Sequence, residues 1–329
     1  MNPRNIKILS TGIALPNKRM TAEEMDEKLG FKEGYFLKRV GVASRYIATD
    51  ELPEDLAAVA LLQAVEKAGL ALKDLDAVIC ASASYIQPLP FSAVIIHSTL
   101  KLDSKVVIFD LDSSCLSFVT ALDMISYSIE AGRFSKVAIV TCELPSKIIN
   151  WEDEESSALF GDGASCVIVG KSDGSSKIIS SHTATYSEGV DLCTIEGGGT
   201  KLTVKEHNES NWDRYCFKMN GTKVFALASK HFEQFIEDLL TPVKLKVSDL
   251  DFVVPHQASL LALKQLQKKI GVKEEQIIFT IHKYGNTVAA SIPMALHEAI
   301  QTDRIKRGDT TMLVGTSAGL CLGGMILEY

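Results

Sequence analysis

The feature that most constrains the fold is an internal repeat. DLDAVICASAS at 74–84 and DLDFVVPHQAS at 249–259 start 175 residues apart (74 to 249), and a helical pattern precedes each copy. At nearly the same offset, KVAIVTCE (136–143) matches TTMLVGTSA (310–318). The same offset aligns Cys115 with Ala290. Three matches in register indicate that one unit was duplicated. We therefore expect two halves, near 1–173 and 174–329.

Strand and helix patterns alternate in both halves. AVICASA, VVIFDLD and VAIVTCE are short, β-branched runs, and a helical pattern follows each of them. In 117–132, for example, Phe118, Leu122, Ile125 and Ile129 recur at helical spacing before Gly132. This alternation predicts an α/β protein in which helices cover both faces of mostly parallel sheets.

Composition excludes several classes of protein. The formal charge is −7 with no basic stripe, which argues against a nucleic-acid partner. No apolar run approaches the roughly 20 residues that span a bilayer, and MNPRNIKILSTG lacks the pattern of a signal peptide. The seven cysteines are scattered, and no Cys/His spacing is typical of a metal site. We expect free thiols in a reducing cytoplasm, and no metal.

Cys115 is the first candidate for chemistry, because it lies between the strand pattern VVIFDL and a predicted helix. A thiol at a helix N-terminus is expected to have a lowered pKa, and the backbone N–H of the same residue can face an acyl oxygen. The alternative is a small core residue, since buried thiols pack well. That alternative is the better interpretation for Cys80, Cys142 and Cys166, which lie in strand-like runs.

His256 and Asn286 occupy similar junctions in the second half. VVPHQAS places His256 just past a predicted strand, where ligands bind in open α/β sheets. Asn286, in YGNTVAAS, precedes a predicted helix and is otherwise an ordinary N-cap or turn residue. A Cys with His and Asn fits either hydrolysis or acyl transfer to carbon, and the spacing does not choose between them.

The ordered set of segments resembles the β-ketoacyl-acyl carrier protein synthase III family of the thiolase superfamily. The similarity runs nearly from end to end, with Cys115 in place. It implies the duplicated, five-layered αβαβα thiolase fold. The segments that carry it are STGIALPNKRMT, LKRVGVASRYIA, ALFGDGASCVIVG, FKMNGTKVF, VVPHQAS, YGNTVAAS and the glycine-rich end.

The resemblance also implies roles. Cys115 would take an acyl group from an acyl thioester. His256 and Asn286 would bind the thioester carbonyl of a malonyl donor and assist its decarboxylation. The backbone N–H groups of Cys115 and Gly319 would form the oxyanion hole. Coenzyme A or acyl carrier protein thioesters would be the substrates, without a metal or redox cofactor, and the enzyme would be a homodimer.

Departures from the family pattern concern the substrate entrance. The family holds the adenine of coenzyme A between a Trp and an Arg, where this chain has Tyr35 and Glu154, although the neighbouring Arg39 is retained. Leu261 replaces a usual basic residue, and Leu89 aligns with the Phe that closes the acyl pocket. These changes argue against standard coenzyme A and carrier-protein docking, and Leu89 predicts a deeper pocket.

The acidic run at 152–155 strengthens this argument if it lines the entrance, and its alternative is a solvated loop. The leading hypothesis is a decarboxylating Claisen condensation in fatty-acid or specialised polyketide-type biosynthesis. Acyl transfer to an oxygen or nitrogen acceptor is the alternative. Non-decarboxylative joining ranks lower, because ASASYIQPLPFS lacks the Glu that such relatives use as base. A non-catalytic subunit and a cysteine protease rank below it.

Overall fold

Two β-sheets form the frame of the molecule. The computed structural model describes residues 2–329, except for the side chain of Glu155. The first sheet has the order β1 (Ile6–Ala14), β7 (Gly163–Lys171), β6 (Lys136–Glu143), β4 (Ala77–Cys80), β5 (Val107–Asp110). The second has the order β8 (Lys177–Thr185), β13 (Cys321–Glu328), β12 (Thr310–Ser317), β11 (Phe252–Pro255).

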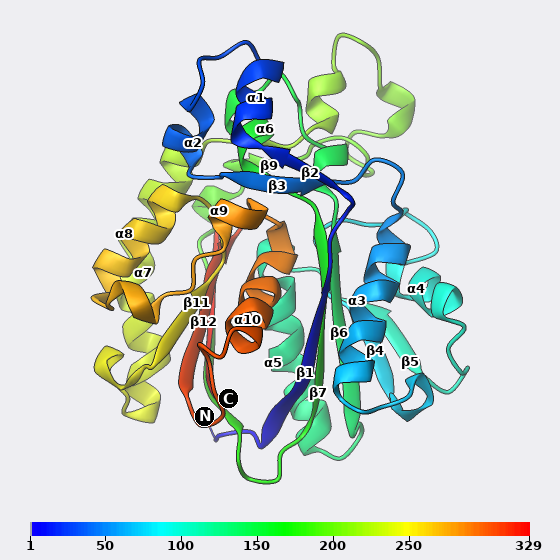
Figure 1. Cartoon of the computed structure of the whole chain (residues 1–329), viewed down its shortest axis with the longest axis vertical. Coiled ribbons are helices and arrows are strands. Elements are labelled where there is room, and N and C mark those ends of the chain that lie inside the picture. The colour runs from blue at the N-terminus through cyan, green and yellow to red at the C-terminus, as the bar shows by residue number, and fades with distance from the viewer. Residues whose placement is uncertain (1) are drawn as a thin grey trace.

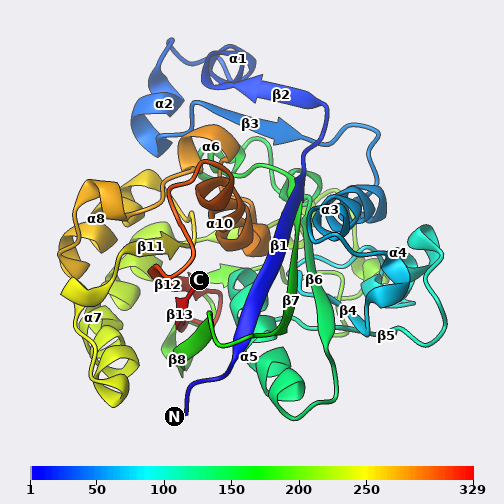
Figure 2. The same cartoon turned by 60° about the horizontal axis from the view of Figure 1, so that its bottom comes forward.

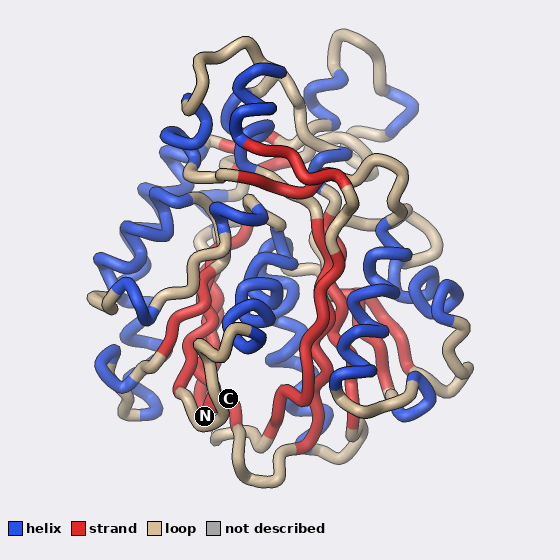
Figure 3. The backbone as a smooth tube through the Cα atoms, viewed as in Figure 1, coloured by secondary structure: helices blue, strands red, loops and turns tan. Residues whose placement is uncertain are grey.

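Helices cover both faces of both sheets, which gives five layers (Figures 1 and 2). The helices α3 (Pro53–Lys67) and α4 (Ser92–Leu100) cover the outer face of the first sheet. On the outer face of the second sheet lies α7 (Gly221–Leu240), with α8 (Leu260–Ile270) against it. Between the sheets, α5 (Ser117–Glu130) and α10 (Ser291–Gln301) contact strands of both. Figure 3 shows the two groups of strands with helices between and around them. The predicted αβαβα fold is confirmed.

The duplication is visible in the strand order. The series β1, β7, β6, β4 in the first sheet corresponds to β8, β13, β12, β11 in the second, and the central helices α5 and α10 correspond in the same way. The strands β4, β5 and β6 run parallel, as do β11 and β12. Their carboxyl ends therefore lie together, which is where parallel α/β sheets place their sites.

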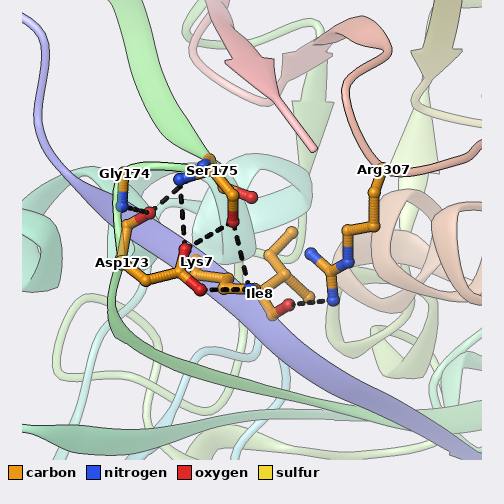
Figure 4. Close-up of polar contacts among 8 residues, drawn as sticks. Lys7, Ile8, Asp173, Gly174, Ser175 and Arg307 are labelled. Atoms are coloured by element: carbon orange, nitrogen blue, oxygen red, sulfur yellow. Dashed lines mark hydrogen bonds and ion pairs between the residues drawn. The ribbon is translucent and has the colours of Figure 1, made fainter.

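The chain passes from the first sheet to the second in a short turn after β7. Asp173 accepts hydrogen bonds from Lys7 Nζ (3.1 Å) and from the N–H of Ser175 (3.1 Å). Lys7 also donates to Ser175 Oγ (3.1 Å), and Arg307 donates to the carbonyl oxygen of Ile8 (2.8 Å; Figure 4). These contacts anchor the turn to β1. The expected boundary near residue 173 lies in this turn, and the division into two halves stays a prediction.

A cap of short elements covers the carboxyl ends of the strands, at the top of Figure 1. Side chains buried in one apolar cluster, among them Phe36, Ile149, Leu159 and Leu263, hold this cap onto the body. The cap consists of β2 (Lys18–Thr21), α1 (Ala22–Lys28), α2 (Tyr35–Val40), β3 (Ser44–Ile47), α6 (Glu154–Leu159), β9 (Cys193–Thr194), β10 (Lys218–Met219) and α9 (Ile281–Tyr284). Across the described residues, no helix combines the length and apolarity that membrane crossing requires.

Candidate active site

One cavity of about 260 Å³ brings Cys115, His256 and Asn286 together. Cys115 and His256 follow the strands β5 and β11, whereas Asn286 follows the short helix α9, so the expected strand-to-helix junction at Asn286 is not found. The rest of the wall is mostly apolar. It includes Ala83, Ser84, Ile148, Leu159, Cys193, Phe217, Met219, Val224, Ala318 and Leu320.

Serine side chains shape the turn that carries Cys115. The N–H of Ser113 donates to Ser117 Oγ (2.8 Å), and that hydroxyl donates to the carbonyl of Ser114 (2.7 Å). The N–H of Ser114 donates to Asp112 Oδ1 (2.7 Å). Ser114 has φ +54°, a left-handed conformation that non-glycine residues seldom adopt. The network therefore fixes a sharp turn that presents Cys115 directly before α5.

The pKa of the Cys115 thiol is higher than its position in the sequence predicts. Burial raises its pKa to about 12, the buried carboxyl of Glu143 contributes in the same direction, and a hydrogen bond from the Ser114 hydroxyl opposes it. The predicted lowering by the helix N-terminus is wrong in direction, because desolvation of a thiolate outweighs the dipole of one helix end. Cys115 therefore rests as a thiol. Burial likewise raises the pKa of Cys80 to about 12, and Cys142 and Cys166 shift in the same direction in the core.

His256 follows β11 directly, and its N–H donates to the carbonyl of Val314 in β12 (2.8 Å). The side chain is 6% exposed, and Nδ1 lies 2.6 Å from Ser291 Oγ. Burial lowers the pKa of the imidazole to about 4, so His256 is neutral at pH 7. A neutral imidazole on the cavity wall can accept a proton or donate a hydrogen bond, depending on its tautomer.

The orientation of the Asn286 amide is fixed by two bonds. Its Oδ1 accepts from the N–H of Val288 (2.9 Å), and its Nδ2 donates to the carbonyl of Ala258 (3.4 Å). An amide nitrogen carries two hydrogens, so one remains for the cavity. The turn interpretation of Asn286 and the functional one are therefore compatible.

Backbone hydrogen bonds at the FGDG motif hold Asn286 in place. The N–H of Asn286 donates to the carbonyl of Leu159 (2.9 Å), and the N–H of Gly161 donates to the carbonyl of Asn286 (3.1 Å). A Cβ at Gly161 would collide with the carbonyl oxygen of Tyr284, so only glycine fits there. The carboxylate of Asp162 accepts hydrogen bonds from the backbone of Ala48 and from Ser146. The motif therefore positions the site, and its first residue, Phe160, also lines the cavity.

Gly319 lies in the turn between β12 and β13. Its φ of +132° is a conformation that other residues rarely adopt, and its neighbours Ala318 and Leu320 line the cavity. This places the backbone of Gly319 beside the site. The role of its N–H in the oxyanion hole stays a prediction.

The five residues expected to bind substrate do not line the cavity. Leu89 and Leu261 are 84% and 65% exposed. Tyr35, Arg39 and Glu154 instead form a network on the cap, in which Tyr35 Oη donates to Glu154 Oε2 (3.0 Å) and Arg39 donates to Tyr35 Oη (2.9 Å). Of the acidic residues at 152–155, Glu154 belongs to this network. The side chain of residue 155 lies outside the described part of the chain.

Sequence reasoning missed four residues around the site. Ser291 contacts His256, and Cys193 is a second thiol on the cavity wall. Gln257 is fully buried and makes four hydrogen bonds, one each to the backbone of residues 255, 278, 280 and 281. Glu143 is fully buried at the end of β6. Its carboxyl accepts hydrogen bonds from the N–H of Ala83 (2.6 Å) and Ser84 Oγ (2.7 Å), so it holds a segment of the wall.

Replacing Glu143 with glutamine should change how stability depends on pH. Burial raises the pKa of Glu143 from 4.5 to about 8, so between these values the folded chain keeps a proton that the unfolded chain has lost. Stability from this group is therefore lost as pH rises through that window, by at most about 1.4 kcal/mol per pH unit. Urea unfolding at pH 5 to 9 should show a flatter profile for Glu143→Gln than for the wild type. Parallel profiles would contradict this, and Glu66→Gln on the exposed face of α3 is the control.

The chain is similar to known proteins over nearly its whole length. Two family models match, 3-oxoacyl-(acyl-carrier-protein) synthase III over residues 109–187 and its C-terminal region over residues 240–329. The chain is 35% identical to a β-ketoacyl-(acyl-carrier-protein) synthase III of Wolbachia pipientis wMel, over 98% of both chains. It is also similar to the crystal structure of 3-oxoacyl-(acyl-carrier-protein) synthase III from Aquifex aeolicus VF5, with a TM-score of 0.89 and 30% identity, covering 98% of this chain and 100% of that one. Xanthomonas campestris OleA, at 19% identity and a TM-score of 0.88, covers 100% of this chain and 99% of its own, and supports the fold alone.

Proposed function

The chain belongs to the β-ketoacyl-(acyl-carrier-protein) synthase III family, and from this premise we propose how its own cavity carries out the reaction. The enzyme is an acyltransferase that condenses a Cys-bound acyl group with a malonyl thioester, with loss of carbon dioxide, to give a 3-oxoacyl thioester. The observation that carries the proposal is the shared cavity of Cys115, His256 and Asn286.

In the first half-reaction, Cys115 Sγ attacks the carbonyl carbon of an acyl thioester. The new C–S bond forms, the bond to the carrier sulfur breaks, and the thiol proton ends on the departing carrier thiol. The N–H groups of Cys115 and Gly319 donate to the acyl oxygen while it carries negative charge. Because the Cys115 thiol has a raised pKa, the proton leaves during the attack and not before it.

In the second half-reaction, the carbonyl oxygen of the malonyl thioester accepts hydrogen bonds from His256 and Asn286. The C–C bond to the carboxylate breaks and carbon dioxide leaves. The electron pair of this bond forms an enolate, whose oxygen His256 and Asn286 stabilise. The enolate carbon attacks the acyl carbon on Cys115, and the C–S bond breaks. The Cys115 sulfur then takes a proton from solvent. Asn286 is retained for this step, so condensation is favoured over transfer to oxygen or nitrogen.

The chemistry is redox-neutral, so we propose that the substrate thioesters are its only small-molecule requirement and that no metal takes part. The substrates are acyl and malonyl thioesters, with acyl carrier protein as a partner and a place in fatty-acid or polyketide-type biosynthesis. The enzyme acts as a homodimer. The support is the loop that follows the cavity residues Ala83 and Ser84, because it carries the exposed side chain of Leu89, which a second copy would cover. Seven free cysteines support a cytoplasmic location.

The test is intact-protein mass spectrometry after incubation with acyl thioesters of short, medium and long chains. One of them should add the mass of its acyl group to the wild type, and malonyl thioester should then remove that mass and yield a 3-oxoacyl product. Labelling without any carbon product would favour the alternative acyl transfer. If no thioester labels the protein, the proposal fails.

We propose that the network of Tyr35, Arg39 and Glu154 on the cap lies at the substrate entrance and influences which carrier the enzyme accepts. Phe31 stacks on the ring of Tyr35 (centroids 4.3 Å apart, 9° between planes), and the hydroxyl of that ring is bonded to Glu154. One face of the ring is therefore covered, and a carboxylate stands beside it. Arg39 lies 3.9 Å from Glu154 and offsets part of its charge, but the exposed carboxylates of Glu152 and Asp153 add negative charge that repels phosphate groups. We therefore propose that the entrance does not favour the nucleotide part of coenzyme A.

Charge reversal at Glu154 should raise activity with coenzyme A. We expect Glu154→Arg to increase kcat/KM for acylation by acyl-coenzyme A roughly three- to tenfold at low salt, with little change for the same acyl group on pantetheine, which lacks the nucleotide. Acylation rates measured by mass spectrometry give this ratio, and Glu66→Arg on α3 is the charge-matched control. Equal changes for both carriers would show that the residue does not face the nucleotide.

A further inference from the structure

Ser291 is the residue that contacts His256 on the side away from the cavity. It is 1% exposed and begins α10. Its Oγ lies 2.6 Å from His256 Nδ1 and accepts the N–H of Gln257 at 3.3 Å. We infer that Ser291 is a positioning residue that donates its hydroxyl hydrogen to Nδ1 and so holds His256 with its proton on Nε2.

The hydrogens of this buried group of side chains determine the tautomer of His256. If Nδ1 carried the proton, Ser291 Oγ would accept from both Nδ1–H and the N–H of Gln257. The hydroxyl hydrogen would then have no acceptor, because the described residues offer Ser291 Oγ no other partner. A buried donor without a partner is unfavourable. With the hydroxyl donating to Nδ1, every group is satisfied, and the single ring proton lies on Nε2.

Nε2 is the ring nitrogen left for the cavity, since Nδ1 is occupied by Ser291. In this tautomer Nε2–H is a donor, like the free hydrogen of the Asn286 amide. It can therefore bind the malonyl thioester oxygen, but it cannot accept the proton of the Cys115 thiol. Ser291 thus assigns His256 to the decarboxylation half-reaction alone. This inference rests on the proposed function and adds how the two half-reactions are kept separate.

The direct test is ¹⁵N NMR of the wild-type protein with labelled histidine, because protonated and unprotonated ring nitrogens have distinct shifts. His256 is assigned by comparison with His256→Ala. We expect an unprotonated Nδ1 and a protonated Nε2 at pH 7. The reverse pattern would overturn the inference. This measurement needs no turnover, so it gives its answer even if the proposed condensation is not observed.

Ser291→Ala tests the consequence for catalysis. Without the hydroxyl, the tautomers of His256 should mix, which the same spectrum reports. Decarboxylation of malonyl thioester should fall roughly ten- to a hundredfold, as for other residues that orient a catalytic histidine, while acylation of Cys115 stays within about twofold. Ser126→Ala, which removes a buried hydroxyl bond to the carbonyl of Asp123 on α5, is the matched control. Unchanged decarboxylation with an unchanged spectrum, or equal loss of both half-reactions, would overturn the inference.

Discussion

Cys115→Ser is expected to abolish stable acylation of the protein. The serine hydroxyl is a much weaker nucleophile than the thiol, and its proton is harder to remove. The site offers it little help, because Glu143 keeps its proton at pH 7 and the hydrogen bond of Ser291 to His256 Nδ1 leaves the ring proton on Nε2. We expect the acylation rate to fall on the order of 10³-fold or more. Intact-protein mass spectrometry after incubation with the preferred acyl thioester measures this loss.

Cys193→Ser is the control for the loss of acylation in Cys115→Ser. Cys193 is a thiol on the wall of the same cavity, so it is exposed to the same substrates, but it does not lie at the sharp turn before α5. Its variant should be acylated like the wild type. If Cys115→Ser still gained the acyl mass and Cys193→Ser did not, the nucleophile would be Cys193.

The repeat and the alternating pattern predict an α/β protein built from two similar units, whereas the five-layered arrangement was expected from the family resemblance. Periodic helices and short β-branched strands, matched at one offset, indicate which elements are equivalent, and equivalent elements occupy equivalent places in the two sheets. The same logic located the site. Cys115 and His256 each follow a strand, as their patterns predict, whereas Asn286 follows the short helix α9, and all three reach one cavity.

Properties that depend on burial and on long-range contacts were beyond the sequence. The setting of Cys115 suggested a lowered pKa, but the burial that raises it depends on the other walls of the cavity, which come from other parts of the chain. Glu143 was not identified from the sequence, because its role depends on contacts with Ala83 and Ser84, which lie 60 and 59 residues away along the chain. Ser291 had one signal, its place five residues after Asn286 in YGNTVAAS, but its partner is His256, 35 residues away.

His256→Ala is expected to separate the two half-reactions. The variant loses one of two N–H donors to the enolate oxygen of the malonyl unit, and a donor aimed at developing charge in a dry cavity is worth roughly 10² to 10³ in rate. Decarboxylation should fall by that factor. Acylation of Cys115 should stay within a few-fold, because that step uses backbone N–H groups and the departing carrier thiol. Release of carbon dioxide from malonyl thioester and the acyl mass on the protein measure the two steps separately.

The pH dependence of decarboxylation by the wild type tests the role of His256 in a second way. Because burial holds the pKa of His256 near 4, below its usual 6.5, the imidazole stays neutral as pH falls from 8 to about 5. The rate of decarboxylation should therefore show no inflection near pH 6.5. His282→Ala, an exposed histidine close to Asn286, should leave both half-reactions unchanged. Equal loss of acylation and decarboxylation in His256→Ala would mean that the histidine serves both steps. Its imidazole would then have to act as a base toward Cys115, which the hydrogen bond to Ser291 opposes.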